Sequence, residues 1–180
     1  MKLLNVLYQV ERLDDDRIDF IHQSEDGLVV RRSFVLSEMG EEPYIIKHSS
    51  TIRNDSKQDL KFKNLYINLG TVFPLNEKEF EHFLTVGAFD GNKPKFTPIN
   101  KVKDSRALSA SNFGDLDNGQ IQEGRFDWVS IQNQYYVGLL SSSISAKRVQ
   151  VLPVYSENET ELGISSNVAF SFDTIASKDS

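Results

Sequence analysis

Histidine serves both metal binding and proton transfer near neutral pH, and the chain has three: His22, His48 and His82. They fall in three separate expected elements, and no two of them have the short spacing of a metal motif such as HExxH. The absence of cysteine excludes a thiolate metal site, a disulfide and a cysteine nucleophile. We therefore expect no metal site, and we expect His22 and His48 to be ordinary residues of a sheet.

Other catalytic patterns are also missing from the sequence. It contains no GxSxG turn to present a nucleophilic serine, and the serines at 141–143 have the composition of a polar turn. It contains no glycine-rich phosphate-binding motif. Asp115 and Asp117 lie in a loop-like stretch, where nothing fixes the carboxylate separation that glycoside hydrolysis needs. The sequence predicts a protein that is not an enzyme, with no catalytic residues and no bound cofactor.

Charge and length restrict the partners and the domain count. The 180 residues include 20 basic and 26 acidic residues, giving a net charge of −6. This acidic balance argues against nucleic acid or an anionic membrane surface as the main partner. No segment approaches the roughly 20 apolar residues of a membrane-spanning helix, and Asn5 and Gln9 interrupt the apolar start that a signal peptide needs. With no repeat or linker, residues 1–180 are expected to form a single β-sandwich domain.

The dominant pattern is an alternation of apolar and polar residues with a period of two. It occurs in segments rich in Val, Ile, Thr, Tyr and Phe that are separated by clusters of Asn, Asp, Gly and Ser. Such segments predict an all-β antiparallel sandwich with few short helices. The expected strands cover residues 17–22, 28–36, 44–53, 59–69, 126–140, 148–155 and 167–172.

One helix and one long loop are expected between the strands. Residues 76–84 place Phe80, Phe83 and Leu84 at helical spacing after a capping Asn76. Residues 86–125 are rich in Gly and Pro, and long loops of this kind are often functional. Three apolar side chains lie in that otherwise polar stretch, and each is expected either to anchor the loop onto a sheet or to be exposed for a partner: Phe89, Phe96 and Phe113.

Trp128 lies in the longest aromatic strand segment, and it is expected to be either a core residue or a wall of a cleft. Around it, residues 126–137 (FDWVSIQNQYYV) resemble the W-[VA]-x-x-x-x-[KQ]-Y-F segment in the extracytoplasmic domain of the YidC family of bacterial membrane protein insertases. Residues 26–34 and 44–54 resemble earlier strands of that family in the same order. Residues 170–178 resemble its closing segment, although Ala176-Ser177 replaces the family's Gly-Pro.

The resemblance covers roughly residues 17–178 and implies a β-supersandwich of the galactose-mutarotase-like type. It further implies a non-catalytic domain at the periplasmic face of the bacterial inner membrane, belonging to a longer, membrane-embedded protein. The implied partners are Sec translocon subunits and nascent membrane proteins, with no nucleic acid. The expected partner-contact residues are Phe89, Phe96, Phe113 and Trp128.

Two other functions remain open at this point. A carbohydrate-binding or aldose-epimerase-like protein has the same sandwich fold, but such epimerases need a histidine acid and a carboxylate base on the concave face. Neither His22 nor His48 lies in an aromatic, carboxylate-rich context. A free-standing protein that shares only the fold is the third hypothesis, because function does not follow from fold.

Overall fold

The computed structural model describes residues 6–37, 45–61, 64–76, 81–103, 108–109, 119–156, 161–171 and 174–177. Strands make up 66% of it and helices 4%, and the described ranges hold no helix of seven residues or more. The pairing is almost entirely antiparallel and forms two sheets, which confirms the predicted all-β class and is consistent with a sandwich. The sequence predicts one domain over residues 1–180, whereas the contacts divide the chain into two compact units.

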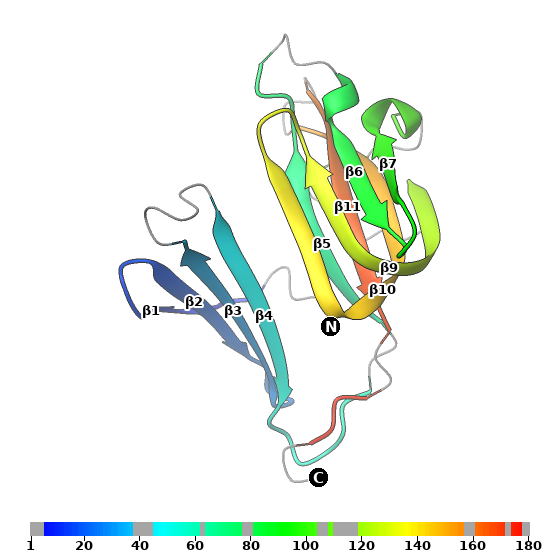
Figure 1. The fold of residues 1–180 in the computed structure, drawn as a ribbon. Coiled ribbons are helices and arrows are strands. Elements are labelled where there is room, and N and C mark those ends of the chain that lie inside the picture. Colours follow the sequence, from blue (N-terminus) through cyan, green and yellow to red (C-terminus); the bar gives the residue numbers. More distant parts are fainter. Residues whose placement is uncertain are drawn as a thin grey trace. The chain divides into compact units, whose positions relative to one another are not determined.

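The first unit comprises residues 1–62 together with 173–180 and contains a four-stranded sheet in the order β1-β2-β3-β4 (Figure 1). Two of its strands have nearly the bounds that the alternation of apolar and polar residues predicts. Strand β3 covers the predicted residues 28–36, and β2 is one residue longer than the predicted segment 17–22. The chain returns to this unit near its other end, where Leu60 and Ile175 form an isolated antiparallel bridge. The strands are β1 (Gln9–Arg12), β2 (Arg17–Gln23), β3 (Leu28–Leu36) and β4 (Ile46–Asn54).

The second unit, residues 63–172, contains a seven-stranded sheet in the order β5-β11-β10-β9-β6-β7, with β8 paired in parallel to β10 (Figure 1). Its elements are β5 (Leu65–Val72), η2 (Glu81–Phe83), β6 (Thr85–Phe89), β7 (Pro94–Pro98), η3 (Ile99–Lys101), β8 (Leu108–Ser109), β9 (Gln120–Gln132), β10 (Val137–Tyr155) and β11 (Leu162–Phe170).

This sheet curls around its own core. Strand β5 contacts β9, and β11 contacts β6, although two strands separate the members of each pair in the sheet order. Register shifts between β9 and β10 lie between Ser141 and Arg148, and such bulges bend and twist a strand pair. The concave face is filled by buried apolar side chains from strands and from η3, among them Val86, Ile99, Ile131, Val149 and Val168.

Several expected elements differ from the structure. The strand expected over residues 59–69 begins only at Leu65, as β5. Residues 77–80 of the expected helix lie outside the described residues, and what is described of its second half is the short η2 turn. The expected loop over 86–125 is wrong, because β6, β7, η3, β8 and the start of β9 lie within it. The expected strand over 126–140 is two strands, since β9 ends at Gln132 and β10 begins at Val137.

Candidate functional site

Three of the four predicted contact residues lie on one face of the seven-stranded sheet. Phe96 of β7 lies opposite Gly87 of β6, and Phe89 of β6 lies opposite Trp128 of β9. Opposed residues in antiparallel strands share a face, as do residues two apart along a strand. Phe89, Phe96 and Trp128 therefore form one surface, which we call the aromatic face. Phe113, the fourth predicted residue, lies outside the described residues.

The aromatic face points away from the core of its unit. The residues of β6 that alternate with Gly87 and Phe89 are Val86 and Ala88, and both belong to the buried core. Phe89 and Trp128 are half-buried, whereas 49% of the Phe96 surface is exposed. Trp128 is therefore part of an outer surface. Of the two expectations for this residue, a position in the core is wrong.

Phe89 and Trp128 are stacked on each other. Their ring centroids are 5.6 Å apart and their planes differ by 11°. Aromatic pairs at this separation add about 0.5–1.5 kcal/mol to the burial of their surface. The stack fixes both side chains in one orientation and leaves part of each ring accessible, which is what a preorganised contact surface requires.

Phe96 is held against the sheet by the lack of a side chain at Gly87. A Cβ atom at Gly87 would lie 2.7 Å from Cε1 of Phe96 and 2.6 Å from Oγ of Ser130. Glycine in a strand commonly marks such a close approach. The exposed ring of Phe96 therefore has a defined position on the sheet, although one side of it meets solvent.

The turn between β6 and β7 aligns the two strands that carry the phenylalanines. Oδ1 of Asp90 accepts hydrogen bonds from the backbone N–H groups of Asn92 and Lys93, at 3.0 and 3.4 Å. These backbone bonds, with a smaller contribution from the charge of Lys95, lower the pKa of Asp90 below its usual value. Gly91 supplies the positive φ of +91° that the turn needs.

Apolar residues continue this surface onto β10. Leu139 lies opposite Ser130, and Val137 lies opposite Gln132, so both share the outer face with Trp128. Sequence reasoning missed them because it placed residues 126–140 in one strand. Asn133 was the available signal, since asparagine favours turns by accepting bonds from nearby backbone N–H groups.

A small polar network lies next to Trp128 in the sequence, at the bulge between β9 and β10. Nε of Arg125 donates a hydrogen bond to Oγ of Ser145 at 3.0 Å, and that hydroxyl donates to Oδ1 of Asp127 at 3.1 Å. Arg125 and Asp127 also form an ion pair at 3.6 Å. The two charges neutralise each other and provide exposed donors and acceptors.

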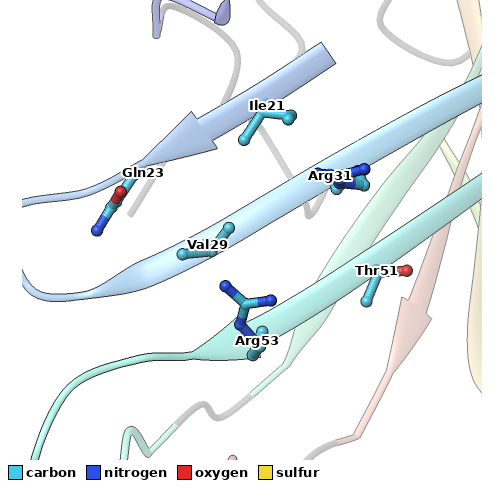
Figure 2. A pocket seen from close by; sticks show the side chains of 6 residues that line it. All are labelled: Ile21, Gln23, Val29, Arg31, Thr51 and Arg53. Atoms are coloured by element: carbon cyan, nitrogen blue, oxygen red, sulfur yellow. The ribbon is translucent and has the colours of Figure 1, made fainter. Parts of the chain in front are cut away.

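A second candidate site is a hollow of about 240 Å³ on one face of the four-stranded sheet (Figure 2). Arg31 contacts Asp19 at 2.9 Å and Glu11 at 3.9 Å, and Arg53 forms two hydrogen bonds with Asp55 at 2.5 and 2.6 Å. Each guanidinium is thus matched by a carboxylate, so the hollow does not attract an anion strongly. Its lining comes from alternate positions of β2, β3 and β4: Ile21, Gln23, Val29, Arg31, Thr51 and Arg53.

Asp19 is the electrostatic centre of that face. Its side chain is fully covered and accepts hydrogen bonds from Nε and Nη2 of Arg17 at 3.1 and 3.2 Å, in addition to the bond from Arg31. The hydrogen bonds from Arg17 are the main reason that the pKa of Asp19 lies below its usual value, with Ser33 and Arg31 acting in the same direction.

The histidines of the four-stranded sheet make structural contacts. Nδ1 of His22 lies 3.0 Å from the carbonyl oxygen of Leu7. The His48 ring stacks on Phe34 with centroids 4.4 Å apart, and its Nε2 lies 3.4 Å from Nε of Arg32. Burial lowers the pKa of His48, and the charge of Arg32 lowers it further. These neighbours are a carbonyl, a phenyl ring and a guanidinium, whereas an epimerase needs a histidine acid near a carboxylate base.

Metal ligands and membrane-spanning helices are not found in the described part of the chain. Among the residues that the structure describes, no group of three His, Cys, Asp or Glu side chains could hold a metal ion. The described ranges also lack a helix long and apolar enough to cross a membrane. Comparisons with models of known protein families, with curated proteins and with solved structures found no match for this chain.

Proposed function

We propose that this chain is a non-catalytic binding module that contacts other proteins through its aromatic face. The observation that carries the proposal is the fixed Phe89–Trp128 stack beside the exposed ring of Phe96. Aromatic side chains dominate the energetics of protein interfaces because they bury a large area and lose little conformational entropy. The positions are fixed before binding, which lowers the entropic cost of association.

The partners and location that we propose come from the resemblance of residues 17–178 to the YidC family. On this proposal the chain is the extracytoplasmic domain of a YidC-like insertase, at the periplasmic face of the bacterial inner membrane. It contacts Sec translocon subunits or nascent membrane proteins, while other segments of the longer protein lie in the membrane. Support for this more specific proposal comes from the similar segments that occur in the same order as in that family: residues 26–34, 44–54, 126–137 and 170–178.

Site-specific crosslinking in cells tests the proposal. A photoreactive phenylalanine analogue replaces Phe89 or Phe96 in the full-length protein, and Tyr155 provides a control at an exposed aromatic position outside the aromatic face. We expect crosslinks to membrane or translocon proteins from Phe89 and Phe96, and none of these from Tyr155. Crosslinks confined to the chain itself would contradict the proposal and would leave the phenylalanines as packing residues.

A carbohydrate-binding protein is the second candidate. Flat aromatic rings near exposed polar groups suit the apolar face and the hydroxyls of a sugar, and Trp128 directly follows Asp127 of the Arg125–Ser145–Asp127 network in the sequence. Titration calorimetry with a panel of oligosaccharides separates the two candidates. Saturable binding that is lost in Trp128→Ala would favour the carbohydrate function over a protein partner.

A further inference from the structure

The hairpin that joins β9 and β10 exposes four apolar or aromatic side chains near its turn. Tyr135, Tyr136, Val137 and Leu139 are 57%, 66%, 65% and 66% exposed, and we call these four residues the hairpin tip. Monomeric proteins rarely expose large apolar side chains in a contiguous group unless the group contacts a partner or a membrane. The turn between β9 and β10 is drawn in yellow in Figure 1, and the four residues lie in this turn or at the start of β10.

The hairpin tip lies within a long segment without charge. None of the 19 residues from Trp128 to Ala146 is Asp, Glu, Lys, Arg or His, although 26% of the chain is charged. The nearest charged residues in sequence are Asp127 and Lys147, each several residues away from the turn. The hairpin tip itself therefore offers no charged group for an ion pair with a partner.

The backbone at the turn is closed by Asn133. Its Oδ1 accepts hydrogen bonds from the backbone N–H groups of Tyr135 and Tyr136, at 3.0 and 2.8 Å. The N–H of Asn133 itself donates to the carbonyl of Tyr136 at 3.0 Å. Nδ2 of Asn133 donates to the carbonyl of Phe73 at 3.2 Å, which ties the turn to the residue after β5. Backbone polar groups that are satisfied in this way can enter a less polar medium at low cost.

We propose that the hairpin tip inserts into the interfacial region of a lipid bilayer with little surface charge. The tip is a turn rather than a hollow, so it suits insertion into a soft surface better than capture of a side chain from a partner. Tyrosine places its ring among apolar groups and its hydroxyl among polar ones, which is the arrangement of the membrane interface. Interfacial segments enter about 5–10 Å deep, which the side chains near a turn can reach. The hairpin tip adjoins the aromatic face, because Val137 and Leu139 share the outer face of the sheet with Trp128, but the inference does not depend on the protein contacts proposed for Phe89 and Phe96.

Co-sedimentation of the 180-residue chain with vesicles tests the inference. We expect binding to pure phosphatidylcholine vesicles, and weaker binding when phosphatidylglycerol is added, because the net charge of −6 is repelled by an anionic surface. The variant Tyr135→Ser/Tyr136→Ser should bind phosphatidylcholine at least tenfold less, since burying one large apolar side chain is worth roughly a factor of ten or more. Far-UV circular dichroism verifies that the variant remains folded.

Phe96→Ser is the matched control, because it removes an exposed aromatic side chain of the same unit outside the hairpin tip. It should leave vesicle binding unchanged while it weakens the protein contacts of the aromatic face. The variant Tyr135→Ser/Tyr136→Ser should lose vesicle binding and keep the protein contacts of the aromatic face. The two variants therefore show separately whether the membrane inference or the proposed protein contacts fail.

Fluorescence quenching by brominated phosphatidylcholine measures the depth of insertion. Trp128 is the one tryptophan of the chain and precedes the end of β9 by four residues, about 13 Å along the strand, so it should not be quenched. In the variant Trp128→Phe/Tyr136→Trp, the indole at the tip should shift to the blue and be quenched. Absence of vesicle binding, or equal binding of the tyrosine variant, would overturn the inference. Loss of self-association in the tyrosine variant without any vesicle binding would also overturn it and would assign the tip to a second copy of the chain.

Discussion

The ring of Phe96 lies over Gly87, where any larger side chain would meet it. We expect Gly87→Ala to destabilise the protein by about 1–3 kcal/mol, as overpacking commonly does. Its Cβ would lie 2.7 Å from Cε1 of Phe96 and 2.6 Å from Oγ of Ser130. Urea unfolding measures the cost, and the same change in a Phe96→Ala background should cost less. An equal cost in both backgrounds would show that the ring of Phe96 does not cause the strain.

Trp128→Ala should cost less than truncation of a core aromatic residue. Trp128 is half-buried and loses mainly its stack with Phe89, so we expect about 1–2 kcal/mol. Phe126, two residues earlier, is 5% exposed in the core, and Phe126→Ala should cost about 3–5 kcal/mol. Chemical denaturation of the two variants gives the comparison. A larger loss for Trp128→Ala would place the tryptophan in the core.

Asp19 should make stability depend on pH in the acid range. Its folded-state pKa lies below the unfolded-state value of about 3.9, mainly because of the hydrogen bonds from Arg17. The stabilisation is therefore fully present above the unfolded pKa and is lost as the pH falls through the folded pKa. Asp19→Asn should flatten the stability profile below about pH 4. Thermal unfolding between pH 2 and pH 6, with the exposed Asp26→Asn as control, measures this, and equal flattening in the control would contradict the assignment.

Asn133→Ala should loosen the β9–β10 turn. Asn133 is 9% exposed and makes two bonds through Oδ1 and one through Nδ2. Removing these partners from backbone groups typically costs about 1–3 kcal/mol. We expect faster amide hydrogen exchange at Tyr135 and Tyr136 than in the wild type. Unchanged exchange rates would mean that the side chain does not hold the turn.

The chain should not accelerate the mutarotation of aldoses. His22 contacts the carbonyl of Leu7 and His48 stacks on Phe34, and these contacts with the described residues are not those of an acid next to a carboxylate base. Polarimetry with glucose or galactose should give the buffer rate, with or without added divalent metal. A rate above buffer that disappears in His22→Ala or His48→Ala would refute the binding-module proposal.

The sequence predicts the strands of the first unit well because their faces differ in polarity. Apolar and polar residues alternate along residues 17–22 and 28–36, and both segments are strands with nearly the same bounds. The region after residue 86 was predicted poorly for a local reason. Gly87, Pro94 and Pro98 each disfavour a strand by propensity, yet Gly87 makes room for Phe96, and both prolines lie in β7 at the end of the sheet order.

The sequence did not indicate the geometry that brings the proposed contact residues together. Phe89, Phe96 and Trp128 were singled out as aromatic residues in unusual contexts, and the strand register places them together. No local pattern indicates that β6 pairs with β9, because that pairing joins residues about 40 positions apart, whereas β6 and β7 are joined by a short turn. The turn at Asn133 was missed because apolar and aromatic residues on both sides of it suggested one continuous strand.

The bridge between Leu60 and Ile175 has a consequence for the order of folding during synthesis. Asn54, which is 2% exposed, donates a hydrogen bond to the carbonyl of Ile175 at 3.0 Å, across 121 positions of the chain. At translation rates of about 5–20 residues per second, Ile175 follows Asn54 by roughly 6–24 s. During that interval strands β1 to β4 have left the ribosome, while the segment that completes their unit has not been made. The second unit, whose residues 63–172 are contiguous, can finish folding first, so the part of the chain that is synthesised earlier is completed later.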